Sequence, residues 1–302
     1  MKYQPYMTVF TPAYNRAHTL PRLYESLKNQ TADGFEWIVI NDGSTDGTEE
    51  LLEKWSGEDN RFDFSYLTVE NGGKPRAINR GVTMARGKYF FLVDSDDYLT
   101  PDAVEKMIAW AKETENDPSF IGVGAARGTP DGKYLKGTPP KVGANGYVDA
   151  TNLERAKYDL DADMCEAYRL DIYRKYPYFT YDGEKFAPEQ ITMNEIALDG
   201  YRLRWHSDII YICEYLEDGL TKGSSALEKK NPMGYAAMYN HMLKYGYGFR
   251  RRFMIAAQMT ALSLYAGHPG YLKETNSLPA TVLSFPVGAI LAIRRRRQFT
   301  KI

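Results

Sequence analysis

The chain has 302 residues, a formal net charge of −1 and 43% hydrophobic residues, values that are ordinary for a soluble globular protein. This length suits one large domain, or one domain with a smaller appendage. Cys165 and Cys213 are the two cysteines, so a disulfide framework is excluded and a reducing compartment is indicated. Residues 1–6 contain no apolar signal region, and we expect the protein to stay on the cytoplasmic side of the membrane.

The charge is unevenly distributed along the chain. Residues 226–302 contain twelve Lys or Arg against two Glu, a net charge of +10, so residues 1–225 carry −11. A basic C-terminal region on an acidic body indicates a partner that carries phosphates, either an anionic membrane surface or a nucleic acid.

Strands and helices alternate in the first 115 residues. Short apolar runs predict strands at residues 7–10, 35–40, 62–69 and 89–93, and helical spacing predicts helices at residues 17–30, 45–55, 75–85 and 101–114. The connections are too long for hairpins, so the pattern predicts an α/β fold with a parallel sheet flanked by helices. Each strand ends in a polar cluster, at residues 11–16, 41–44, 70–74 and 94–97, and open α/β sheets bind ligands at that carboxyl edge.

The fourth of these clusters has the clearest chemistry. The apolar residues 89–93 run directly into Asp94, Ser95, Asp96 and Asp97. Three carboxylates this close repel one another, and a hard cation such as Mg²⁺ or Mn²⁺ is a suitable counter-charge. Alternation aims Asp94 and Asp96 at one point, whereas Asp97 is free to cap the helix predicted from residue 101. The alternative is an acidic loop that only caps that helix.

The pattern becomes α+β after residue 115. A hairpin with an Asp-Gly turn is predicted at residues 120–135, followed by a strand at 164–169, a short helix at 170–176, a helix at 189–198 and strands at 201–205 and 209–214. We expect this part to form the second wall of a cleft.

From about residue 225 the chain is helical and basic. Helices are predicted at residues 233–245 and 249–266, with Arg250, Arg251 and Arg252 at their junction. Residues 278–293 contain no charge and precede four arginines, but they are shorter than the ~20 residues of a membrane-spanning helix, and Pro286 interrupts them. We interpret them as an in-plane or re-entrant membrane anchor; the alternative is a terminal helix docked on its own domain. A nucleic-acid partner fits an uncharged apolar run less well.

Several motifs resemble one family. Residues 8–16 (TVFTPAYNR), 39–48 (VINDGSTDGT), 79–81 (NRG), 85–89 (ARGKY) and 94–97 (DSDD) are similar to the family-2 glycosyltransferases with the GT-A fold, in the right order and over roughly the first 110 residues. More weakly, residues 184–191 (EKFAPEQI) and 215–221 (YLEDGLT) resemble members that build bacterial surface polysaccharides.

The resemblance implies a nucleotide-diphosphate sugar as donor, most often a UDP-sugar. Asp42 would accept a hydrogen bond from the uracil N–H, Asp94 would face the ribose and the metal, Asp96 would bind Mn²⁺ or Mg²⁺ directly, and Lys74 could reach the diphosphate. The remaining residues of the implied donor pocket are Thr11, Ala13, Tyr14, Asn15, Arg16 and Ser95.

The resemblance also implies a carboxylate base that takes the proton of the acceptor hydroxyl. Family members commonly have a Glu-Asp pair at the start of a helix, whereas this sequence has Glu189 followed by Gln190. Glu189 falls where the base would be; the alternative is an acidic residue that only favours the helix dipole.

Together these inferences predict a GT-A domain at residues 1–225, with a nucleotide-sugar half (1–115) and an acceptor half (116–225), and a membrane-associating region at 226–302. The expected function is inverting transfer of a sugar to a lipid-linked saccharide at the inner face of the plasma membrane. The alternatives are an Asp-x-Asp phosphatase and an inactive membrane-bound scaffold. The donor sugar, the linkage and the oligomeric state are not predicted.

Overall fold

The structure is a computed structural model that describes residues 4–135, 137–160, 164–214 and 224–300. The chain forms two compact units. The first comprises residues 1–177 and 193–215, and the second comprises residues 178–192 and 216–302. Residues 178–192, which the sequence placed in the acceptor half, therefore pack with the C-terminal helices.

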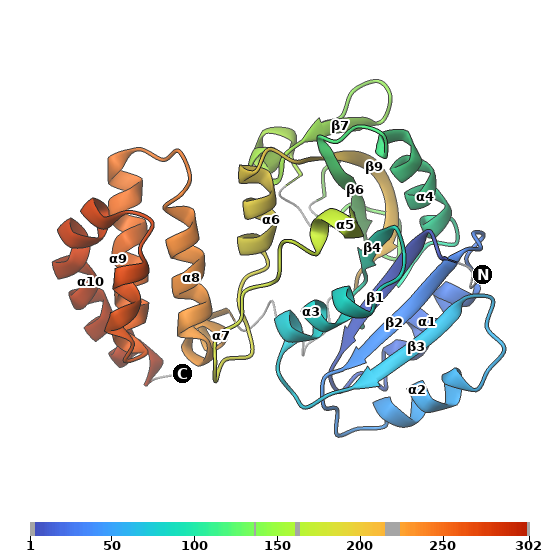
Figure 1. Cartoon of the computed structure of the whole chain (residues 1–302), viewed down its shortest axis with the longest axis horizontal. Coiled ribbons are helices and arrows are strands. Elements are labelled where there is room, and N and C mark those ends of the chain that lie inside the picture. The colour runs from blue at the N-terminus through green and yellow to red at the C-terminus, as the bar shows by residue number, and fades with distance from the viewer. Residues whose placement is uncertain (1–3, 136, 161–163, 215–223, 301–302) are drawn as a thin grey trace. The chain divides into compact units, whose positions relative to one another are not determined.

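The first four strands are parallel neighbours, as predicted. They are β1 (Met7–Ala13), β2 (Phe35–Asn41), β3 (Asp63–Thr68) and β4 (Tyr89–Leu92), in the order β3-β2-β1-β4 (Figure 1). The helices between them are α1 (Leu20–Lys28), α2 (Thr48–Ser56) and α3 (Lys74–Met84). Every residue of β2 is buried, which explains its continuous apolar run from Trp37 to Ile40.

The sheet continues from β4 with mixed directions. Strand β8 (Met164–Arg169) is antiparallel to β4 and to β6 (Phe120–Gly128), which is parallel to β9 (Arg202–Ile212). Strands β5 (Tyr98–Leu99) and β7 (Tyr147–Ala150) are both antiparallel to β9. The remaining elements of this unit are α4 (Ala103–Thr114), the 3₁₀ helix η1 (Asn152–Tyr158) and α5 (Leu170–Tyr173).

Two local predictions were wrong, and a third holds in shortened form. The strands expected at residues 201–205 and 209–214 are one strand, β9, whose pairing with β6 is irregular between Gly124 and Arg127. The predicted hairpin with its Asp-Gly turn is present but short, since its arms are joined by a single antiparallel bridge between Gly128 and Tyr134. Asp97 does not cap a helix at residue 101, because the chain first extends through β5, and α4 begins at Ala103.

The second unit is helical. It contains α7 (Ser224–Lys230), α8 (Pro232–Met242), α9 (Phe249–Tyr265), the 3₁₀ helix η3 (Pro269–Glu274) and α10 (Leu278–Phe299), and α8, α9 and α10 lie side by side (Figure 1). Helix α6 (Gln190–Leu198) begins in this unit and ends in the first. Pro286 does not interrupt α10, which continues through all four arginines.

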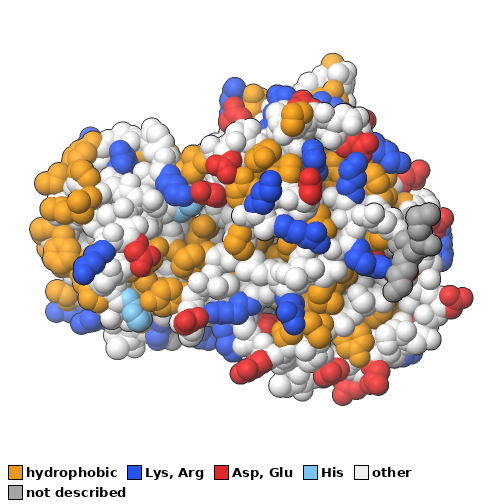
Figure 2. Space-filling view, viewed as in Figure 1, with side chains coloured by type: hydrophobic (Ala, Val, Ile, Leu, Met, Phe, Trp, Pro, Cys, Tyr) orange, Lys and Arg blue, Asp and Glu red, His pale blue; other side chains and the backbone are white. Residues whose placement is uncertain are grey.

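Helix α10 packs on α9 through small and hydroxylated residues. Its buried residues include Ala280, Thr281, Ser284, Gly288 and Ala292. Gly288 is required at its position, because a Cβ there would lie 2.6 Å from the side chain of Thr260 on α9. The large apolar residues lie on the opposite face and are 45% to 65% exposed: Leu278, Val282, Leu283, Phe285, Ile290 and Ile293. Figure 2 shows hydrophobic side chains gathered over α10.

Candidate active site

The polar ends of the first four strands contact one another in the first unit, as the parallel topology predicts. The N–H of Asn15, after β1, donates to the hydroxyl of Ser44, after β2 (2.9 Å). The Arg16 guanidinium lies 3.8 Å from the carboxylate of Asp96, after β4. The four clusters therefore form one continuous polar edge.

Asp42 fixes the loop that follows β3. Its two carboxylate oxygens accept the N–H groups of Gly72 (2.7 Å) and Gly73 (2.8 Å), and its backbone carbonyl accepts the Asn71 amide. The side chain is 4% exposed. The Asn71 amide also donates to Oδ2 (3.3 Å), so a second lone pair remains on Oδ1, and Asp42 retains the capacity to accept a further hydrogen bond there.

Asp94 lies between two cationic side chains. Its Oδ1 is 2.7 Å from Lys74 Nζ, at the start of α3, and its Oδ2 is 3.3 Å from a guanidinium nitrogen of Arg127, on β6. Burial alone would raise the pKa of Asp94, but Lys74 and Arg127 outweigh it and hold that pKa well below its usual range. The protein itself therefore supplies part of the counter-charge that the acidic cluster requires.

The other residues of the acidic cluster differ in exposure. The Asp96 carboxylate is 26% exposed, and its backbone carbonyl accepts a hydrogen bond from Arg22 at 2.7 Å. Ser95 is buried. Asp97 is also buried, and burial together with the neighbouring Asp94 raises its pKa to about 7. Asp96 is thus the carboxylate of the cluster that is most accessible to a ligand.

Arg127 and Tyr211 belong to this site but were not predicted. The Tyr211 hydroxyl, on β9, accepts the N–H of Asp94 at 2.7 Å and hydrogen-bonds Asp97, while Arg127 lies over its ring with 4.2 Å to the centroid. Arg127 also donates to the Met164 carbonyl (3.0 Å). One signal was present in the sequence, because an arginine inside an otherwise apolar buried strand requires a charged or polar partner.

The remaining predicted donor-site residues lie at the end of β1. Thr11 is buried, and its hydroxyl accepts a hydrogen bond from the Trp37 indole (3.1 Å), so it is part of the core. Ala13 is buried, whereas the Tyr14 ring is 48% exposed. Asn15 adopts a left-handed conformation, with φ of 55°. The buried part of β1 thus ends at Ala13, and the backbone turns two residues later at Asn15.

Glu189 belongs to the second unit and is half-buried. It directly precedes α6, as predicted, and the N–H of Ile191 donates to the carbonyl of Pro188 at 3.2 Å. Its carboxylate is therefore placed by the loop 178–192, and not by the sheet that carries the acidic cluster.

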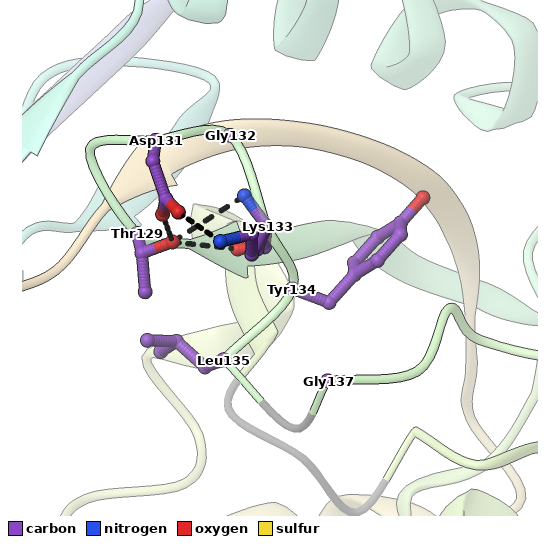
Figure 3. Close-up of a pocket in the computed structure, with 7 residues that line it drawn as sticks. All are labelled: Thr129, Asp131, Gly132, Lys133, Tyr134, Leu135 and Gly137. Atoms are coloured by element: carbon purple, nitrogen blue, oxygen red, sulfur yellow. Dashed lines mark hydrogen bonds and ion pairs between the residues drawn. The ribbon is translucent and has the colours of Figure 1, made fainter.

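A separate pocket is formed by the turn after β6 (Figure 3). The Thr129 hydroxyl hydrogen-bonds Asp131 inside the turn, and the Tyr134 hydroxyl donates to the Ser207 carbonyl at 2.9 Å. The pocket shares no residue with the acidic cluster. Its lining residues are Thr129, Asp131, Gly132, Lys133, Tyr134, Leu135 and Gly137.

The donor atoms present suit a divalent cation held jointly with a phosphate ligand. Across the described ranges, no group of three or more His, Cys, Asp or Glu side chains is arranged as a complete metal site. Mg²⁺ is commonly bound by one or two carboxylates together with substrate phosphates, and Asp94 and Asp96 provide such a pair. The residues therefore fit a metal that binds together with a nucleotide diphosphate.

Sequence comparisons identify relatives of this chain. Chondroitin synthase of Pasteurella multocida (strain Pm70) is 37% identical over 145 residues, which is 47% of this chain and 14% of that protein. The putative teichuronic acid biosynthesis glycosyltransferase TuaG of Bacillus subtilis (strain 168) is 33% identical over 135 residues, 44% of this chain and 53% of that protein. The match thus spans only part of each relative.

Solved structures share the fold. TarS 1-349 of S. aureus in complex with UDP-GlcNAc has a TM-score of 0.62 at 20% identity, covering 95% of this chain and 81% of that one. The mannosyltransferase PcManGT from Pyrobaculum calidifontis, in complex with GDP-Man and Mn²⁺, has a TM-score of 0.57 at 19% identity, covering 99% and 84%. The sheet and its helices thus form the expected GT-A fold. The profile of glycosyl transferase family 2 matches residues 8–176, more than half of the chain, and the chain belongs to that family.

Proposed function

We propose that this protein is a metal-dependent, inverting glycosyltransferase that moves a sugar from a UDP-sugar to a hydroxyl of a saccharide acceptor. The main support is the carboxyl edge of the sheet, where Lys74 and Arg127 flank Asp94, and Arg16 lies beside Asp96. Such alternation of carboxylates and cations suits a ligand that brings both a diphosphate and a divalent cation.

Each donor-site residue has a role in this proposal. Asp42 accepts the uracil N–H with the remaining lone pair of its Oδ1, while it keeps Gly72 and Gly73 in place. Asp94 and Asp96 hold Mn²⁺ or Mg²⁺, which when bound neutralises charge on the departing diphosphate. Lys74 stabilises the same negative charge from the start of α3.

The chemical step requires a base on the acceptor side. Glu189 removes the proton of the acceptor hydroxyl as that oxygen attacks the anomeric carbon, and the bond between this carbon and the diphosphate oxygen breaks. One attack from the side opposite the leaving group inverts the anomeric configuration, and UDP is released. The names of the relatives, a chondroitin synthase and a teichuronic acid biosynthesis glycosyltransferase, support a saccharide of a bacterial surface polysaccharide as the acceptor. We further propose that this saccharide is lipid-linked, because α10 would hold the enzyme at the membrane.

We place the enzyme on the cytoplasmic face of the plasma membrane, held there by α10. This helix is long and apolar enough to cross a membrane by length and composition, and 28% of its most apolar stretch is buried in the protein. Helices in lipid commonly pack on one another through small residues and direct large apolar residues outward, and α10 has the same arrangement. The exposed Arg294 and Arg297 at the end of this face suit anionic headgroups.

A hydrolysis screen tests the catalytic proposal. The full-length protein is incubated with a panel of nucleotide-sugars and Mn²⁺, because slow hydrolysis of the correct donor requires no acceptor. We expect one UDP-sugar to be hydrolysed and EDTA to suppress the reaction. Absence of hydrolysis together with absence of UDP binding would favour the inactive scaffold instead.

A further inference from the structure

The loop that carries Glu189 is anchored on the N-terminus of α8, within the second unit. Glu184 is 9% exposed, and its Oε1 and Oε2 accept the N–H groups of Met233 (2.7 Å) and Gly234 (2.8 Å). These N–H groups belong to the first turn of α8 and have no partner within the helix. A carboxylate at this end of a helix is also favoured by the helix dipole.

The anchoring is reciprocal. Asn231, the residue before α8, accepts the N–H groups of Lys185 (2.9 Å) and Phe186 (3.0 Å) with its Oδ1. Its amide nitrogen donates to the Leu227 carbonyl at 2.9 Å, which fixes the orientation of the side chain. The loop thus caps the helix through Glu184, and the helix holds the loop through Asn231.

The loop also approaches α8 too closely for a side chain between them. A Cβ on Gly234 would lie 2.3 Å from the carbonyl oxygen of Phe186, so only glycine fits. Ala187 is buried immediately afterwards. Two residues, Ala187 and Pro188, separate Phe186 from Glu189, so little chain is left in which a displacement of the anchor could be absorbed before α6 begins.

We infer that Glu184 is a positioning residue for Glu189, acting through its anchor on α8. This inference rests on the proposed function, in which Glu189 is the base. A small misplacement of a catalytic group can reduce turnover by ~10²-fold without changing the chemistry. Asp94 and Asp96 belong to the other unit, so loss of the anchor should leave binding of UDP unchanged.

The test compares Glu184→Gln with the wild-type enzyme in steady-state turnover. Glutamine keeps the size of the side chain but replaces one acceptor oxygen by an NH₂ group that faces an N–H donor. We expect kcat to fall ~10-fold to 100-fold, with the Kd for UDP within about twofold. Glu228→Gln is the matched control: it removes a carboxylate of the same unit that pairs with Arg295 (2.9 Å), and its kcat should stay within about twofold.

Two substitutions of Asn231 provide a second test, which also serves if Glu184→Gln fails to fold. Asn231→Asp retains an acceptor for both loop N–H groups but loses the hydrogen bond to the Leu227 carbonyl, and it should keep most of the turnover. Asn231→Leu removes the acceptor as well and should lose turnover as Glu184→Gln does. Both are measured well below their melting temperatures, where a merely stabilising residue would leave kcat unchanged.

The outcomes separate this inference from the proposed function. Folded Glu184→Gln with wild-type kcat, or equal turnover of the two Asn231 variants, would overturn the positioning role. If Glu189→Gln keeps normal turnover, the assignment of the base fails, and the positioning role fails with it. Two results together would support both the positioning role and the assignment of the base. Glu184→Gln and Asn231→Leu would have a lower kcat while Asn231→Asp and Glu228→Gln would not, and Glu189→Gln would be inactive.

Discussion

The sheet of the first unit and helix α10 of the second place their polar and apolar side chains in opposite ways. In the first unit large apolar residues such as Trp37 and Phe91 are fully buried, and charged groups gather at the ends of the strands. In the second unit α10 buries Ser284 and Gly288 against α9 and exposes Leu283 and Ile290. The first arrangement is typical of a water-soluble α/β fold, and the second resembles packing in lipid.

The residues of the proposed chemistry are also divided between the two units. The acidic cluster and its cations belong to the first unit, whereas Glu189 and its anchor belong to the second. Donor binding, base catalysis and membrane attachment should therefore respond to different substitutions. Four experiments test this division, beginning with the largest expected effect.

Asp96→Ala should abolish transfer and the metal-dependent binding of UDP while the fold survives. The substitution removes the most accessible carboxylate of the proposed metal site, and we expect a loss on the order of 10⁴-fold in turnover, since donor binding and catalysis are both affected. Titration calorimetry with UDP and Mn²⁺ measures the binding. Asp33→Ala, which removes an exposed ion pair with Arg61, is the control. Wild-type binding of UDP that ignores EDTA would contradict the metal site.

Glu189→Gln should keep the affinity for the UDP-sugar and lose turnover by ~10²–10⁴-fold, the usual contribution of a general base. This outcome would separate the second unit, which carries the base, from the first, which binds the donor. The anomeric configuration of the wild-type product, read by NMR, should be inverted. Near-normal turnover of the variant would move the role elsewhere, with Asp182 and Glu195 as the next candidates, since both oxygens of the buried Glu184 already cap α8. Retained configuration would exclude a single direct attack.

Leu283→Glu combined with Ile290→Glu should release the protein from anionic liposomes. Both side chains lie on the exposed face of α10, at 58% and 54%, so the change leaves the contact with α9 intact. Full burial of each such side chain is worth ~1.5–3 kcal/mol, and we expect at least a ~10-fold lower partition coefficient in a flotation assay, with unchanged binding of UDP.

Leu153→Glu, at a 40% exposed position of the first unit, is the control for this experiment. If the wild-type chain does not bind anionic liposomes at moderate salt, the exposed apolar face of α10 contacts a protein surface and not a membrane. A concentration-dependent dimer would then identify that surface as a second copy of the chain. The proposed transferase activity would be unaffected.

The smallest effect concerns His206 in the first unit. Its ring stacks on Trp110 at 3.9 Å, and burial lowers its pKa to about 4 from an ordinary value of 6.5; Asp208 and Asp149 oppose this effect, and Arg204 adds to it. The unfolded chain therefore binds more protons between these values, and stability is lost as the pH falls from 6.5 to 4.

We expect this residue to account for about 1–2 kcal/mol of that loss in the free energy of unfolding. Urea denaturation at several pH values measures it. His206→Gln should flatten this part of the profile, and the same substitution at the exposed His268 should not. Identical profiles of wild type and His206→Gln would show that His206 is protonated equally in both states.

The sequence determined the elements and the location of the donor edge. Apolar runs and helical spacing in residues 7–114 predicted each strand of the parallel part, because these patterns depend on burial within a few residues. Parallel connections then place all their carboxyl ends on one edge, so Arg16, Asp42, Lys74 and Asp94 were expected together before any contact was known. The family motifs include Arg16, Asp42 and Asp94, whereas Lys74 was expected only from its place after the third strand.

Contacts between residues that are distant in the sequence could be identified only from the tertiary structure. Tyr211 reaches the Asp94 amide across 117 residues, and Arg127 reaches its carboxylate across 33, and no local pattern encodes such pairs. Likewise the carboxylate of Glu184 accepts a hydrogen bond from Met233, at the start of α8 and 49 residues further along the chain. This contact holds the loop that carries Glu189 in the helical unit. The face that α10 turns outward was also undetermined, because a helix apolar on all sides does not specify which side is buried until α9 packs on its small residues.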